Sequence, residues 1–243
     1  MQAIILAAGL SKRLRPLTDA APKCLLNIGK KNLLHRTIDN IYENGIDELI
    51  IVTGYKENMI KDYVCENFPQ LKTQFISNLD YENNNNSYSL WMTKDFVKDD
   101  ILLLDSDILF DKSVISELLK SGHENCLAVN VTKNLDNEQI KVIVNEHNKI
   151  HQIGKGVSIE KAIGESIGIE KFSLYYMKEL FTILDRKIVK ENNVNEFYEV
   201  SFQEIIDNNN ERNSIFGVDV SDYKCIEIDT LEDYGNAQNI LQD

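Results

Sequence analysis

Short apolar runs alternate along the chain with longer segments in which apolar residues recur every three or four positions. Runs such as AIILAA and DILLL are typical of strands buried on both faces of a parallel sheet. These runs predict strands over residues 3–8, 48–53, 73–77, 100–104, 127–132, 164–173 and 225–229. The helical spacing predicts helices over residues 33–44, 58–68, 87–94, 114–120, 174–184, 200–208 and 231–241. This alternation predicts an α/β fold, with a doubly wound, mostly parallel, Rossmann-like sheet.

Two departures from this alternation are expected. Residues 139–145 and 149–153 alternate apolar and polar positions around a turn, which predicts a small antiparallel excursion. Pro16 and Pro22 predict that the segment after the first strand stays out of helix. No linker or repeat divides the chain, so we expect a single domain over residues 1–243 with an insertion at residues 137–172.

Charge is distributed unevenly. The formal net charge is −13, which argues against nucleic acid as a partner. The first 36 residues nevertheless carry seven basic side chains against one acid, Asp19. Such a basic segment in an acidic protein suits a small anion, although charge alone leaves a chance surface cluster open. The four cysteines form no CxxC pair, and neither a signal peptide nor an apolar run of membrane-spanning length is apparent. We therefore expect a cytoplasmic protein without a membrane partner.

The loop after the first strand has the character of a phosphate-binding turn. Gly9 permits close approach of backbone N–H groups to phosphate oxygens. Arg13 offers a planar fork for such oxygens, and Lys23 offers a mobile point charge. The chain has no GxGxxG after this strand and no GxxxxGK[ST], so the loop is neither a dinucleotide fingerprint nor a Walker loop.

The segment GLSKRLRPLT, followed by Pro22 and Lys23, resembles the signature of the nucleotidyltransferase superfamily. This superfamily includes sugar-1-phosphate nucleotidyltransferases and phosphocholine cytidylyltransferases. The resemblance implies that the loop wraps an NTP triphosphate, and that Arg13, Lys23 and Asp107 take part in catalysis. The residues that it implies for nucleotide binding are Leu6, Ala8, Gly9, Leu10, Ser11, Lys12, Arg13, Lys23, Asn86, Ser89 and Asp105.

Two aspartates stand where apolar strands end. Asp107 follows the DILLL run, and Asp229 ends CIEID. Hard carboxylate oxygens at the carboxyl ends of strands suit Mg²⁺, yet periodicity alone leaves helix caps as an alternative for both. The resemblance implies that Asp107 and Asp229 bind the metal, with Asp105 in a secondary role.

The asparagine-rich run ending in Tyr-Ser-Leu (NNNNSYSL) resembles the corresponding stretch of phosphocholine cytidylyltransferases, which favours CTP. Asn86 and Ser89 would then contact the base. The strand GESIGI resembles the wall of the acceptor pocket, so Glu165 and Gly168 are expected to bind the acceptor, and residues 137–172 lie on that side. The sole tryptophan, Trp91, is expected to pack rather than to form a cage for choline.

The resulting hypothesis is a Mg²⁺-dependent cytidylyltransferase. It would transfer CMP from CTP to a small phosphorylated acceptor (phosphocholine, a phosphonate, or a phosphorylated amine or amide), and pyrophosphate would leave. The product would be a precursor of a surface polysaccharide or lipid headgroup. Two alternatives are a sugar-1-phosphate nucleotidyltransferase that uses another NTP, and a regulatory nucleotide-binding module without turnover. The sequence does not determine the oligomeric state, and a homodimer stays open.

Overall fold

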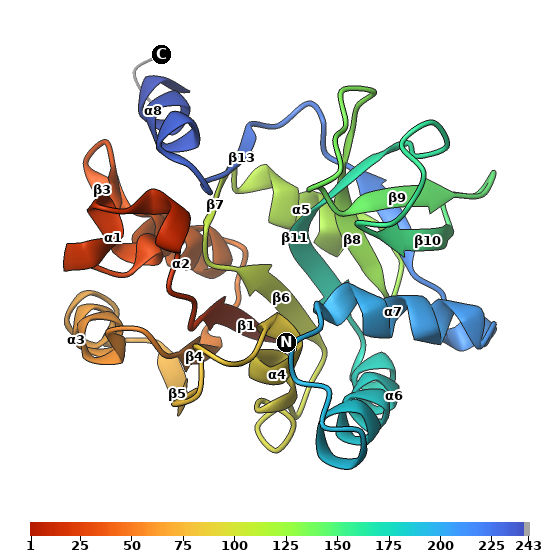
Figure 1. Cartoon of the computed structure of the whole chain (residues 1–243), viewed down its shortest axis with the longest axis horizontal. Helices are drawn as coiled ribbons and strands as arrows, with labels where there is room; N and C mark the ends of the chain where they lie inside the picture. Colours follow the sequence, from red (N-terminus) through yellow and green to blue (C-terminus); the bar gives the residue numbers. More distant parts are fainter. Residues whose placement is uncertain (241–243) are drawn as a thin grey trace.

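The structure, a computed structural model, describes residues 1–240 and is built on one nine-stranded sheet (Figure 1). Its parallel part has the order β6-β1-β4-β5, with β1 at its centre. These strands are β1 (Gln2–Ala7), β4 (Glu48–Thr53), β5 (Lys72–Ser77) and β6 (Ile101–Asp105). All six residues of β1 are buried, as expected for a central strand covered on both faces.

The other half of the sheet is mostly antiparallel. A long strand, β11 (Gly164–Phe172), pairs with β6, β8 and β9, and β10 extends the edge beyond β9. The remaining strands here are β8 (Cys126–Val131), β9 (Lys141–Val144), β10 (Ile150–Gly154) and β12 (Phe216–Asp219), which runs parallel to β8. The predicted antiparallel excursion is therefore the β9–β10 hairpin.

Helices cover both faces of the sheet, so the molecule has three layers (Figure 1). One apolar core joins the sheet to α4 (Asn86–Trp91), α6 (Leu174–Asp185) and α7 (Tyr198–Asp207). The other joins it to α2 (Leu33–Glu43), α3 (Glu57–Asn67) and α5 (Ser113–Lys120). Neighbouring residues of β1 alternate between the two cores, as the pleat of a strand requires. None of the helices within residues 1–240 is long and apolar enough to cross a membrane.

The predicted α/β fold is confirmed, and several short elements correct the details. The segment after β1 is not free of helix: Pro16 and Pro22 flank short turns at η1 (Lys12–Leu14), α1 (Leu17–Ala20) and η2 (Lys23–Leu25). Proline is tolerated at the start of a helical turn, where its missing N–H has no partner to lose. Several short elements were not predicted. They are the strands β2 (Asn27–Ile28), β3 (Lys31–Asn32), β7 (Ile108–Phe110) and β12, the π-helix η3 (Arg186–Lys190) and the 3-10 helix η4 (Glu211–Asn213).

The chain's closing strand and helix lie against its beginning. The late strand β13 (Cys225–Glu227) pairs with β7 and is followed by α8 (Leu231–Ile240). Leu241, at which the predicted helix ends, lies outside the described residues. A third apolar cluster gathers side chains from the loop after β1, from β7 and from α8; it consists of Leu14, Leu26, Ile28, Leu33, Leu109, Ile228 and Ala237. The C-terminal segment therefore helps to fix the N-terminal loop.

A tight turn after β4 also holds this loop. The N–H of Tyr55 donates to the carbonyl of Ala8 (3.1 Å), and the Tyr55 hydroxyl donates to the carbonyl of Thr18 (3.0 Å). Thr18 Oγ1 in turn donates to the carbonyl of Ser11 (3.0 Å). The turn can approach this closely because residue 54 is glycine: a Cβ there would lie 2.7 Å from the Ala8 oxygen and 2.9 Å from Tyr81 Cβ.

We expect Gly54→Ala to lower the free energy of unfolding by about 1–3 kcal/mol, because the added methyl group meets backbone that cannot move without displacing β1. Urea denaturation measures the change. Gly235→Ala is the matched control, since a Cβ at this position in α8 meets nothing within 4 Å. This control should be neutral, or stabilising by up to about 1 kcal/mol. Equal effects of the two substitutions would contradict the packing argument.

Candidate active site

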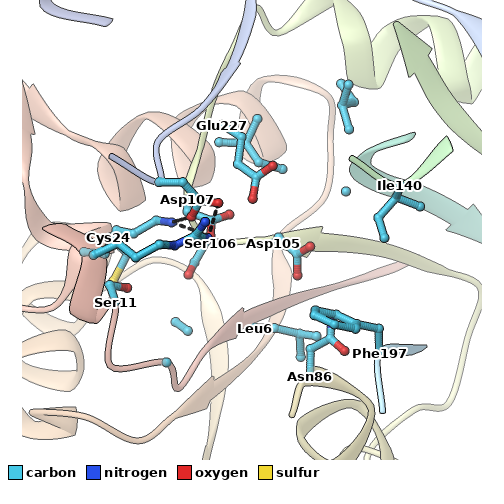
Figure 2. A pocket seen from close by; sticks show the side chains of 18 of the residues that line it. Leu6, Ser11, Cys24, Asn86, Asp105, Ser106, Asp107, Ile140, Phe197 and Glu227 are labelled. Atoms are coloured by element: carbon cyan, nitrogen blue, oxygen red, sulfur yellow. Dashed lines mark hydrogen bonds and ion pairs between the residues drawn. The ribbon is translucent and has the colours of Figure 1, made fainter. Parts of the chain in front are cut away.

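A cavity of about 800 Å³ opens at the carboxyl ends of the parallel strands. Its walls come from the loops after β1, β5 and β6, from β11, and from the segment that follows β13. Figure 2 shows Asp105, Asp107 and Glu227 around one opening, with Ile140 and Phe197 across from them. Ligands of open α/β sheets bind at this edge, because loops from several strands converge there.

A buried lysine joins the two predicted aspartates. Lys23 is 6% exposed, and its Nζ lies 2.8 Å from Asp107 Oδ2 and 2.7 Å from Asp229 Oδ1. Arg13 Nη2 donates to the other oxygen of Asp229. Burial alone would lower the pKa of Lys23, but the two carboxylates outweigh it and raise that pKa. Although partial burial opposes them, Lys23 and Arg13 hold the pKa of Asp229 below its usual value. Neither aspartate carboxylate acts as the helix cap that periodicity allowed.

A third carboxylate, Glu227, completes this cluster. One carboxylate oxygen from each of Asp107, Glu227 and Asp229 lies within 4.8 Å of the others. Glu227 faces the cavity, where partial desolvation and the charges of the two aspartates raise its pKa to about 8. Asp107 Oδ1 is buried without a hydrogen-bond partner. This hard-oxygen donor set, with one oxygen unpaired, fits a divalent cation such as Mg²⁺.

The two residues predicted to contact the base, Asn86 and Ser89, line the same cavity. Leu6 and Ala8, predicted for nucleotide binding, also contribute to its wall. Asn86 Oδ1 accepts a hydrogen bond from the N–H of Tyr198 (3.0 Å), and Ser89 Oγ accepts one from Asn78 Nδ2 (3.1 Å). Sequence reasoning missed Asn78, although its place directly after β5 is the kind of signal that identified Asp107 after β6.

The predicted triphosphate loop only partly lines the cavity. Gly9, Ser11 and Arg13 reach it, whereas Leu10 and Lys12 do not. A Cβ on Gly9 would meet no protein atom within 4 Å, so the loop leaves open space at the place predicted for phosphate. Ser11, directly before η1, adopts the left-handed conformation (φ 49°).

Glu165 and Gly168, the predicted acceptor residues, lie on β11 at the cavity wall. Burial raises the pKa of Glu165, whose carboxylate accepts a hydrogen bond from Asn130 (3.1 Å). Gly168 has a φ of 70°, and a Cβ there would lie 2.8 Å from Asp105 Oδ2, so this glycine makes room for Asp105. Tyr198 donates its hydroxyl to the same oxygen (2.9 Å).

Sequence reasoning missed Glu199 altogether. This residue of α7 lines the cavity, is 5% exposed, and has one oxygen, Oε2, without a hydrogen-bond partner. Burial raises its pKa to about 7. The predicted helix began one residue later, at Val200, and the pattern gave no reason to place an acid on its buried face.

Comparison with known proteins finds relatives that align over nearly the whole chain. Choline-phosphate cytidylyltransferase of Streptococcus pneumoniae is 25% identical over the whole of this chain and 99% of its own length. CTP:phosphoglutamine cytidylyltransferase of Campylobacter jejuni is 29% identical over 96% of this chain and 97% of its own. In fold, the chain resembles the solved CTP:phosphocholine cytidylyltransferase of S. pneumoniae, with a TM-score of 0.81 at 23% identity over 99% of this chain and 98% of that one.

Residues 2–153 match the family model named "Nucleotidyl transferase". This stretch includes the loop after β1, Lys23, the asparagine-rich segment and Asp107, and it covers more than half of the chain. The protein therefore belongs to the nucleotidyl transferase family.

Proposed function

We propose that this protein transfers CMP from CTP to a small phosphorylated acceptor and releases pyrophosphate. The observation that carries the proposal is the buried ion-pair cluster in which Lys23 bridges Asp107 and Asp229, with Glu227 alongside. Two relatives that align over nearly their whole length are named as cytidylyltransferases, one for phosphocholine and one for phosphoglutamine. Their shared donor and their different acceptors support a CTP site that is joined to a variable acceptor site.

In this reaction an acceptor phosphate oxygen attacks the α-phosphorus of CTP. A new P–O bond forms, the bond from the α-phosphorus to the oxygen that bridges to the β-phosphate breaks, and pyrophosphate leaves. The acceptor oxygen is already ionised, so no protein nucleophile or base is needed, and the chain contributes positioning and charge neutralisation. Arg13 and Lys23 lie where they would compensate the charge of the phosphates. Asp107, Glu227 and Asp229 would hold Mg²⁺, which supplies further neutralisation of the phosphate oxygens.

The charges of the cluster explain how a metal and a triphosphate would enter together. In the structure, the positive side chains of Lys23 and Arg13 are paired with carboxylates. With Asp107, Glu227 and Asp229 holding a divalent cation, Lys23 and Arg13 would be free to pair with phosphate oxygens. Such an exchange leaves no buried charge unpaired, which is the condition for an ion cluster inside a protein to be tolerated.

Two groups of lining residues suggest how each substrate would be selected. Amide and hydroxyl groups of Asn78, Asn84, Asn86 and Ser89 provide donors and acceptors for a cytosine edge. Glu165 and Glu199 favour an acceptor with N–H, ammonium or hydroxyl donors, because both are acidic and Oε2 of Glu199 is unpaired. We assign residues 137–172 to this acceptor side of a single domain.

A panel of the four NTPs against phosphocholine, a phosphorylated amide, 2-aminoethylphosphonate and sugar 1-phosphates tests the proposal. We expect Mg²⁺-dependent pyrophosphate release with CTP and an acceptor that bears a nitrogen. Release that requires another NTP together with a sugar 1-phosphate would contradict it. Absence of release, combined with no rise in melting temperature on addition of CTP and Mg²⁺, would also count against it.

We expect Asp107→Asn to lower kcat at least about 100-fold, because the substitution removes a charged ligand from the metal site and a charged partner from the ion pair with Lys23. Titration of activity with Mg²⁺ should show a shift to higher metal concentration. The matched control is Asp222→Asn, the same change at an exposed turn outside the cavity, which should leave kcat and the metal dependence unchanged. An unaltered metal dependence in Asp107→Asn would remove this aspartate from the metal site.

Replacing Glu199 should raise the stability of the protein and weaken acceptor binding. Its pKa is about 7 in the folded protein against about 4.5 ordinarily, so the folded state keeps a proton that the unfolded chain loses. The destabilisation is therefore absent below pH 4.5, grows up to pH 7 and is constant above it. We expect Glu199→Gln to be more stable than wild type by up to about 3 kcal/mol at pH 8, and equal to it near pH 4.5.

Urea denaturation between pH 5 and 8 measures this difference, and acceptor KM measures the accompanying loss of binding. Glu160→Gln, at an exposed position, is the control and should change stability by less than about 0.5 kcal/mol at every pH. A difference between Glu199→Gln and wild type that does not vary with pH would contradict a buried, titrating carboxyl.

A further inference from the structure

A second cavity, of about 500 Å³, adjoins the first. It lies between β10 with its following turn and α7, which pack against each other. Four residues line both cavities: Ile140, Lys155, Phe197 and Glu199. The two spaces therefore meet at a shared boundary, and a ligand in the first cavity can extend into the second.

The walls of the second cavity offer mainly apolar contacts. Ile153, Val157 and Val200 line it together with the shared Ile140 and Phe197. Two amide side chains, Gln152 and Gln203, also line it, and that of Gln203 is already hydrogen-bonded within the protein. Gln203 Oε1 accepts from the N–H of Ile153 (2.8 Å), and Gln203 Nε2 donates to Asp207 (2.8 Å). An occupant would thus gain from burying apolar surface rather than from replacing unmet hydrogen bonds.

The boundary combines an exposed lysine–phenylalanine contact with a buried carboxyl group. Lys155 Nζ lies 4.7 Å from the centre of the Phe197 ring and 3.3 Å from Glu138, and both Phe197 and Lys155 are exposed. The unpaired Oε2 of Glu199 lies at this boundary, buried and without a donor. A chain that crosses from one cavity to the other would satisfy this oxygen if it carried an N–H or O–H at that point.

We propose that the second cavity is a subsite for the distal part of the acceptor, and that it selects an extended phosphomonoester with an uncharged, partly apolar end rather than a compact headgroup. The acceptor phosphate lies in the first cavity, a hydrogen-bond donor faces Glu199, and the distal segment fills the groove between β10 and α7. This assignment rests on the proposed transfer to a phosphorylated acceptor.

A homologous series of N-acyl phosphoethanolamines with acyl chains of two to six carbons tests the subsite. Isothermal titration measures Kd for the protein loaded with Mg²⁺ and a CTP analogue whose α,β-bridging oxygen is replaced by methylene, so that binding is separated from transfer. Each methylene buried in the groove should tighten Kd by about three- to fourfold. Val200→Trp, a change at a 45% exposed position that fills the groove, should weaken binding of the longest members at least about tenfold and leave the shortest unchanged.

Val189→Trp is the control, because Val189 is 63% exposed and lines neither cavity. It should reproduce the wild-type series. A Kd that does not improve with chain length, or a gain that Val200→Trp leaves intact, overturns the subsite. Pyrophosphate release with CTP and Mg²⁺, measured on the same series, reports on the transfer reaction separately. A length-dependent Kd without release would keep the subsite and reject the proposed function.

Discussion

The ion pairs of Lys23 with Asp107 and Asp229 join three distant parts of the sequence, and the architecture of the site depends on them. Burying Lys23 without one of its carboxylate partners would be costly, so the three groups must be held close together in the folded protein. The apolar cluster around Leu14 and Ile228 holds them close, because it packs the loop after β1 against the closing segment. The N-terminal loop and the late strand are therefore one structural unit, although more than 200 residues separate them.

Sequence reasoning found the groups whose positions follow from strand ends and from a long signature. The loop, Lys23, Asp107 and Asp229 could be placed because each directly follows a strong apolar run or belongs to that signature. Glu199 could not be placed in this way, since its role comes from the docking of α7 over the cavity. Elements such as β7 and β12 were missed because they are short and their pairing is set by tertiary contacts.

The strands β6 and β11 carry buried acids that a stable fold would not need. Glu170, fully buried on β11, has no hydrogen-bond partner for either oxygen, and burial raises its pKa well above the usual value. The pKa of Asp105 is raised in the same way, by burial and by the charge of Asp107. Carboxyls in this environment favour the neutral form, which limits the penalty of burying them. We interpret the cluster as stability given up near a binding site.

The contrast between the halves of the sheet explains why relatives with one nucleotide can differ in acceptor. The proposed nucleotide site lies at the ends of β1 and β6, whose side chains are buried in two cores and cannot change without cost to the fold. The proposed acceptor subsite is lined by β10, by the turn after it and by the first turn of α7, where exposed residues such as Phe197 and Val200 form the wall. Substitution there would alter the shape of a groove without disturbing the ion cluster. On this proposal, acceptor choice can vary while Lys23, Asp107 and Asp229 keep their geometry.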